Sequence, residues 1–241
     1  MPGREEQAPD LQLDVGRIIE TLTALRNRIS ERFPGSGLGS LCDRFLAIAN
    51  RSIDRLTWVG TPILPLRIAI AVCVLVLIAL PVWLVATAGL PARAPNFFEL
   101  VQALEAGVND IIFIGLVLFF LFTLEGRIKR RRALHFLREL RALAHIIDMH
   151  QLTKDPDPAI RRLASTPSSP DRDIQQGQLG RYLDYCSEML SLVSKVAALY
   201  AQTFDDPVVL GAVDEVESLT TGLSGKIWQK IMILERNLAV D

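Results

Sequence analysis

The chain has 241 residues, of which 50% are hydrophobic and 22% are charged, and its formal net charge is -1. A chain so close to neutral has no overall field that would attract nucleic acid, so we expect no nucleic-acid partner. The combination of many apolar and many charged residues is typical of a chain divided between lipid and water. The three cysteines, Cys42, Cys73 and Cys186, are dispersed and odd in number. They argue against a disulfide framework and indicate reduced thiols.

The first part of the chain is predicted to be a disordered tail followed by a cytoplasmic helical hairpin. Residues 1–9 carry Pro, Gly and charge without an apolar face, and we expect no cleavable signal peptide there. Residues 10–61 contain two apolar stripes separated by a break rich in Pro and Gly. The stripes are Leu11, Val15, Ile18, Leu22, Leu25, Ile29 and Phe33, then Leu38, Leu41, Phe45, Ile48, Ser52 and Leu56. Spacings of three and four residues are typical of helices that bury one face each.

Residues 62–90 are predicted to form a first transmembrane helix. Within them, residues 66–88 are largely apolar and carry a single charge, Arg67, and a hydrocarbon core of about 30 Å is crossed by about 20 helical residues. Arg67 lies in the first turn, where a long side chain can reach the lipid headgroups. Trp58 and Trp83 are predicted to be interfacial anchors near opposite ends of this span. A buried helix of a soluble protein is the alternative, but so short a chain would hardly surround such a helix.

The next segment is predicted to be an outside loop and a second span. Residues 91–107 are expected to hold a short helix that begins at a capping box formed by Asn96 and Glu99. Residues 108–126 are predicted to be the second transmembrane helix, entered at Gly107. The apolar run here is near the lower length limit of a span, so a re-entrant or interfacial helix is the alternative.

The positions of the basic residues predict the orientation of both spans. The loop between the spans has one basic residue, Arg93, whereas the flanks on the other side are rich in arginine. By the positive-inside rule both termini are expected to be cytoplasmic, in a multi-pass protein of the cell membrane, which is the inner membrane in a Gram-negative cell. The residues directly after the second span, which we call the basic cluster, are expected to bind anionic lipid headgroups rather than nucleic acid. They are Arg127, Lys129, Arg130, Arg131 and Arg132.

The segment after the second span is predicted to be helical and then irregular. Residues 127–164 are predicted to be a cytoplasmic extension helix that includes a short helical piece over residues 159–164. Residues 165–174 read STPSSPDRDI, and this composition predicts a linker.

The last segment, residues 175–241, is predicted to be an antiparallel helical hairpin. Its second helix is expected to begin at Pro207, which follows two aspartates. Trp228 and Met232 lie off the main apolar stripe of that helix, so they are candidate contacts for a second copy or a partner protein. Because no alternating strand pattern occurs, the predicted fold is an all-α membrane protein with two transmembrane helices and a cytoplasmic helical bundle.

Residues that would carry catalysis or bind a metal are few. His145 and Asp148 are three residues apart, a spacing that metal ligands use, and His150 follows, but no further ligand completes the set. The sequence GLSGK at residues 222–226 lacks the full spacing of a phosphate-binding loop and follows no strand. We therefore expect no metal, no cofactor and no enzymatic activity.

Three classes of function are compatible with these features. The first is a membrane-anchored interaction or scaffold protein whose cytoplasmic bundle self-associates or binds a partner. The second is a homo-oligomeric pore or channel gated by the bundle, and the third is a membrane protein that binds a metal or cofactor through His145, Asp148 and His150. Ionisable groups are absent from the centres of the predicted spans, which argues against a dedicated transporter. We expect the first class.

Overall fold

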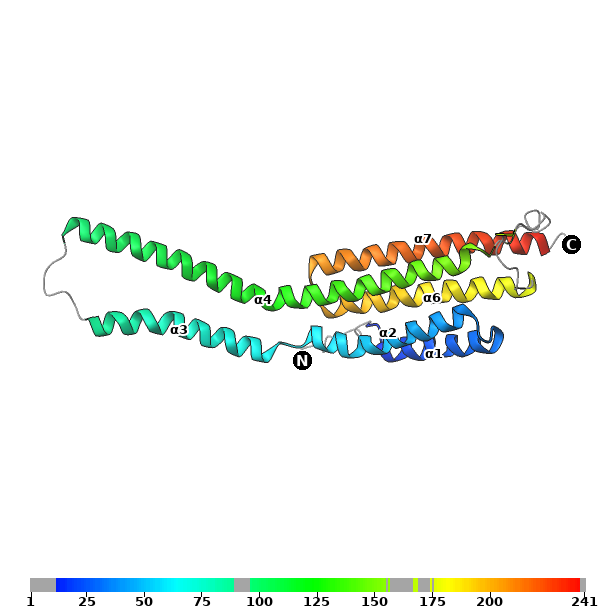
Figure 1. The fold of residues 1–241 in the computed structure, drawn as a ribbon, viewed down its shortest axis with the longest axis horizontal. Helices are drawn as coiled ribbons and strands as arrows, with labels where there is room; N and C mark the ends of the chain where they lie inside the picture. The colour runs from blue at the N-terminus through cyan, green and yellow to red at the C-terminus, as the bar shows by residue number, and fades with distance from the viewer. Residues whose placement is uncertain are drawn as a thin grey trace, which may run out of the picture. The chain divides into compact units, whose positions relative to one another are not determined.

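The computed structural model describes residues 12–88, 96–154, 156, 167–168, 174 and 176–238. Every regular element in these residues is an α-helix (Figure 1). The helices are α1 (Val15–Arg32), α2 (Gly37–Gly60), α3 (Leu64–Ala88), α4 (Phe97–Leu152), α6 (Gln176–Thr203) and α7 (Pro207–Leu238). The predicted all-α fold is confirmed over the described residues. The predicted disordered tail, the helical piece over residues 159–164 and most of the predicted linker lie outside them.

The chain divides into two compact units. The first, which we call the bundle, comprises residues 1–60 and 132–241, and the second, the two-helix unit, comprises residues 61–131. The bundle therefore contains α1, α2, the C-terminal part of α4, α6 and α7. The two-helix unit contains α3 and the N-terminal part of α4.

Short acidic side chains cap the starts of two helices of the bundle, α1 and α7. The carboxylate of Asp14 accepts hydrogen bonds from the backbone N–H groups of Gly16 (2.7 Å) and Arg17 (3.4 Å) at the start of α1. Asp206 does the same for Val208 (3.0 Å) and Val209 (3.2 Å) at the start of α7. Such caps satisfy N–H groups that have no partner inside the helix. The predicted helix start at Pro207 is confirmed.

The turn between α1 and α2 depends on one glycine. Gly35 has φ of 70°, a left-handed conformation that residues with a side chain rarely adopt. The chain reverses there, and α1 and α2 pack against each other as the predicted hairpin. Their apolar stripes point into the core, where Leu22, Leu25 and Phe45 are fully buried.

Helix α6 is at the centre of the bundle. It packs against α1, α2 and α7, and it runs antiparallel to α7 (Figure 1). Its largest fully buried side chains are Leu179, Leu183, Met189, Leu190 and Tyr200. Helices α6 and α7 thus lie in the segment for which the sequence predicted an antiparallel hairpin, and burial of their apolar residues supplies the main favourable energy of the bundle.

Helix α4 is a single helix of 56 residues, Phe97–Leu152. The segments predicted as a short loop helix, a second span and the start of an extension helix therefore lie in one helix, which continues through Gly107. A glycine inside a helix destabilises it by only about 1 kcal/mol, which neighbouring helix-forming residues offset. The predicted capping pair forms at the start of α4 rather than at the start of a separate short helix. The backbone N–H of Asn96 donates to Glu99 Oε2 at 2.8 Å.

The two-helix unit exposes its apolar side chains. Helix α3 has 25 residues, and α3 and α4 are each long and apolar enough to cross a membrane. In the most apolar 18-residue stretch of each helix, none of the residues is buried. Exposed examples are Leu75, Ile78, Ile111, Phe113 and Phe119. Over residues 61–88 and 96–131, the two-helix unit thus has no apolar core of the kind that the bundle has.

Candidate functional site

An ion cluster joins α3 to α4 in the two-helix unit. Glu125 on α4 pairs with Arg67 on α3 (Nε to Oε2, 2.8 Å) and with Lys129 one turn further along α4 (Nζ to Oε1, 3.0 Å). The backbone N–H of Ile63 also donates to Glu125 Oε1, at 3.3 Å. Two cations and one carboxylate leave this cluster with a net charge of +1. The sequence predicted that Arg67 and Lys129 would face lipid headgroups but did not predict their common partner.

The arginines of the basic cluster have other surroundings than Lys129, which is paired with Glu125. The Arg127 guanidinium lies 5.6 Å from the centre of the Phe120 ring on the same helix. Arg131 and Arg132 are exposed, whereas Lys129 is buried against Glu125. The basic cluster therefore combines one lysine that is paired with Glu125 and exposed arginines, whose guanidinium groups are suited to binding phosphate. Their contact with lipid headgroups remains a prediction.

The two tryptophans predicted as interfacial anchors lie in different units. Trp83 is exposed on α3. Trp58 is on α2 in the bundle, half-buried, and the Arg132 guanidinium lies over its ring at 3.9 Å from the centre. A cation over an indole face is a favourable electrostatic contact. Trp58 therefore also links α2 to α4 within the bundle, a role that the sequence did not predict, and the anchor function of both residues remains a prediction.

Helix α7 carries an exposed apolar pair outside its core-facing stripe. The side chains of Trp228 and Met232 are 61% and 49% exposed, although the adjacent residues Ile227 and Ile231 are buried. Because Trp228 and Met232 are four residues apart, they lie on the same face of the helix. The structure thus exposes the two residues predicted as partner contacts, and contact itself remains a prediction.

A polar network connects α2, α4 and α6 inside the bundle. The Tyr200 hydroxyl lies 3.4 Å from Ser52 Oγ, and both side chains are buried. Arg55 donates to Glu139 Oε2 at 2.8 Å and lies over the Phe136 ring at 3.9 Å. Burial raises the pKa of Tyr200, so its hydroxyl stays protonated. These contacts hold α2, α4 and α6 together within the bundle.

The structure does not bring the three candidate ligands of the histidine region together. His145 is exposed, and Asp148 accepts a hydrogen bond from the Gln151 amide at 2.6 Å. No group of three or more His, Cys, Asp or Glu side chains that would hold a metal ion occurs in the part of the chain that the structure describes. His145, Asp148 and His150 are therefore not brought together as a ligand set.

His150 instead packs against the start of α2. Its Cε1 would lie only 2.8 Å from a Cβ atom at position 37, so a side chain in place of Gly37 would displace the imidazole. The imidazole borders a pocket of about 540 Å³ that is also lined by Lys154, Tyr182 and Ser36. Burial, and secondarily the charge of Lys154, lowers the pKa of His150.

The lowered pKa of His150 predicts a pH dependence of stability. The unfolded chain binds the proton more readily than the folded chain, so the free energy of unfolding should fall as the pH drops below about 6.5. The His150→Gln variant should lose this part of the pH dependence. Denaturant unfolding of the full-length protein in detergent between pH 5 and pH 8 measures it. The exposed His145→Gln variant is the control and should keep the wild-type slope; an unchanged slope in His150→Gln would contradict the prediction.

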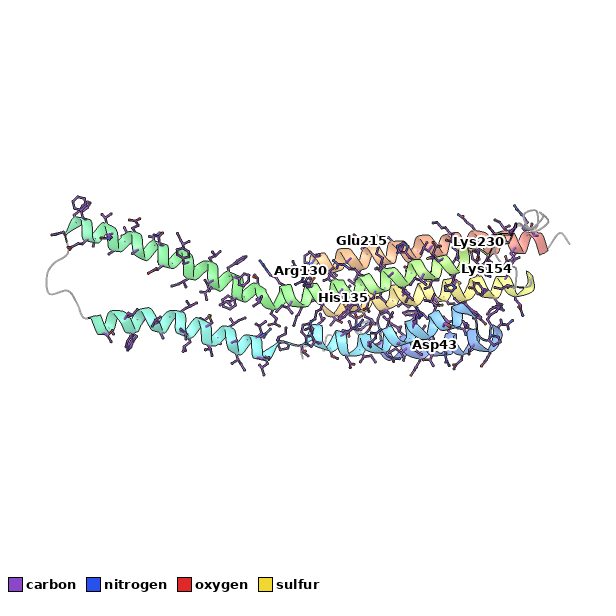
Figure 2. All side chains as sticks on the ribbon, in the orientation of Figure 1. Asp43, Arg130, His135, Lys154, Glu215 and Lys230 are labelled. Carbon is purple, nitrogen blue, oxygen red and sulfur yellow. The ribbon has the colours of Figure 1, made fainter. Side chains whose placement is uncertain are left out.

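Lys230 on α7 forms hydrogen bonds at the C-terminal end of α4. Its ammonium donates to the carbonyl oxygens of Gln151 (2.8 Å) and Lys154 (3.3 Å). Figure 2 labels Lys230 and Lys154 at the same end of the bundle. The last carbonyl groups of a helix lack partners within it, and a cation there also interacts favourably with the helix dipole. This contact between distant residues was not predictable from local sequence patterns.

The remaining candidate groups are structural. Cys42 and Cys186 are buried free thiols, and burial raises the pKa of each to about 12, so neither is a ready nucleophile. Residues 222–226, which faintly resemble a phosphate-binding loop, lie in the interior of α7. Their backbone N–H groups face along a helix and cannot surround a phosphate.

Comparisons with protein-family models, with curated proteins and with solved structures find no match to this chain.

Proposed function

We propose that this protein is a membrane-anchored scaffold. Helix α3 and the N-terminal part of α4 cross a membrane, the bundle lies on the cytoplasmic side, and α7 mediates self-association of the bundle. The observation that carries this proposal is the contrast between the two units: the bundle buries its apolar residues in a core, and the two-helix unit exposes them.

The energetic argument for a lipid environment is simple. Each large apolar side chain left in water forgoes about 1.5–3 kcal/mol of transfer free energy. Soluble monomers rarely expose contiguous apolar patches larger than a few hundred Å². Residues such as Leu75, Ile111 and Phe113 are mostly exposed in the two-helix unit, on helices of sufficient length to cross a bilayer. Lipid tails cover such surfaces without requiring a protein core.

The charge distribution supports the proposed orientation. The basic cluster and Arg67 lie at one end of the apolar stretches, whereas the segment between α3 and α4 has the single basic residue Arg93. Cytoplasmic segments next to a span typically carry this excess of Lys and Arg. The ion cluster around Glu125 would then lie at the level of the inner-leaflet headgroups.

The exposed pair on α7 supports self-association as the scaffold function. Tryptophan is enriched among the residues that contribute most to protein–protein binding, and methionine adapts to irregular apolar surfaces. Trp228 and Met232 supply such a surface on the bundle. The polar network at Tyr200 and the protonated thiols give no support for a reaction.

The test is the mass of the full-length protein in nanodiscs. The wild type should form a defined oligomer, and the double variant Trp228→Ala/Met232→Ala should dissociate at a concentration at least about tenfold higher, which is a change of about 1.4 kcal/mol per protomer contact. The control Val208→Ala/Leu210→Ala removes exposed apolar residues elsewhere on α7 and should leave the mass unchanged. A wild-type protein that stays monomeric, or that conducts ions across liposomes, would contradict the scaffold proposal.

A further inference from the structure

The two-helix unit contains an apolar groove between α3 and α4. Its volume is about 660 Å³. Its lining on α3 is a single helical stripe, with spacings of three and four residues, and Phe122 and Glu125 of α4 complete it. The residues on α3 are Arg67, Ile70, Ala71, Val74, Leu75 and Ile78. The groove is therefore charged at one end, at Arg67 and Glu125, and apolar over the rest of its length.

We infer that this groove holds one acyl chain of an anionic phospholipid whose phosphate binds to Arg67. The inference rests on the proposed function, because it requires α3 and α4 to lie in a membrane. It goes further by assigning a specific lipid site to named residues.

The length of the groove fits an acyl chain of one leaflet. From Arg67 to Ile78 is eleven residues, which at about 1.5 Å per residue is about 17 Å. Half of a hydrocarbon core of about 30 Å is about 15 Å. The groove thus extends from the headgroup level to the middle of the bilayer. A spanning helix of a second copy would need a groove that continued along the whole of α3.

The charge at the open end favours an anionic headgroup. Arg67 uses Nε and Nη2 to bind Glu125, at 2.8 and 3.5 Å, and its side chain is still 59% exposed. Its Nη1 makes no hydrogen bond to the residues that the structure describes. The Glu125 carboxylate is already neutralised by Arg67 and Lys129, and the net charge of the cluster is +1. A guanidinium group held in this way offers its free edge to a phosphate.

The experiment compares two tryptophan variants that differ by two positions on α3. Ala71→Trp fills the groove, whereas Ala69→Trp places the same side chain on a different face of the helix, outside the groove lining. Full-length protein is placed in nanodiscs with equal amounts of phosphatidylglycerol and phosphatidylcholine, and retained lipid is identified by native mass spectrometry. The wild type and Ala69→Trp should retain one phosphatidylglycerol, and Ala71→Trp should lose it. Arg67→Gln should reduce the preference for phosphatidylglycerol about five-fold.

The controls separate this inference from the proposed function. Flotation with liposomes tests membrane association, and circular dichroism tests helical folding of each variant. A wild-type protein that floats but retains no lipid would overturn the lipid site and leave the membrane anchor intact. A protein that does not float would overturn both. Equal lipid retention in Ala71→Trp and Ala69→Trp, or loss of a dimer rather than of a lipid in Ala71→Trp, would also overturn the lipid site.

Discussion

The double variant Val76→Arg/Leu80→Arg is expected to prevent α3 from spanning the membrane. Both side chains are exposed on α3, and neither lines the groove. An arginine at the centre of a span raises its insertion free energy by about 2.5–3.5 kcal/mol, and the lost Val or Leu adds about 0.5 kcal/mol. The pair therefore opposes insertion by about 7 kcal/mol, which is comparable to the favourable contribution of the remaining apolar residues. Most chains should then fail to insert α3.

Two measurements check this expectation, and a matched variant controls for added charge. A cysteine introduced between α3 and α4 should become inaccessible from outside the cell, and the protein should be extracted more readily by carbonate. The control Ile53→Arg/Leu64→Arg adds the same charge at exposed positions on α2 and in the first turn of α3. It should insert normally. Normal insertion of Val76→Arg/Leu80→Arg would contradict the span, because a helix exposed to water tolerates arginine on its surface.

Local sequence patterns predicted most of the helices. The apolar stripe from Ile18 to Ile29 places one face of α1 in the core, and the Asp206–Pro207 pair supplies both an acceptor and a preset backbone angle at the start of α7. These features act over three or four residues, within one turn of helix. They can therefore be identified without knowing the partner of each helix.

The continuity of α4 shows where local patterns mislead. Gly107 suggested a boundary, but Phe97–Leu152 is one helix. A boundary requires either a group that competes for backbone hydrogen bonds or a backbone angle outside the helical range. Gly107 imposes neither, and nothing within 4 Å of it constrains its surroundings. The low helix propensity of Gly107 alone was too weak to interrupt the helix.

The contacts that define the candidate sites could not be predicted from the sequence. Arg67 meets Glu125 across 58 positions, and Tyr200 meets Ser52 across 148. Such pairs depend on which helices are neighbours and on how each is rotated about its axis. Apolar periodicity predicts which face of a helix is buried, but it does not specify the opposing helix. The exposure of Trp228 and Met232 could be predicted from the sequence, because it depends only on the apolar periodicity of their own helix.

Leu190→Ala is expected to destabilise the bundle strongly. Leu190 is 0% exposed on the central helix α6, so its truncation leaves a cavity among α6 and its neighbours. Such substitutions reduce the free energy of unfolding by about 2–5 kcal/mol, a large part of the 5–15 kcal/mol that is typical of a whole domain. Denaturant unfolding of the full-length protein in detergent, followed by circular dichroism, measures the loss.

A second leucine on the neighbouring helix provides the comparison for Leu190. Leu210→Ala makes the same chemical change on α7, where the side chain is 38% exposed, and should lower the free energy of unfolding by less than about 1 kcal/mol. Similar losses in both variants would contradict the assignment of Leu190 to the core. Because neither substitution alters α3 or the apolar stretch of α4, both variants should still float with liposomes. Leu190→Ala should therefore destabilise the bundle while membrane association persists. This behaviour is expected of a scaffold whose core is stabilised by burial of apolar residues away from water and whose anchor is stabilised by contact with lipid.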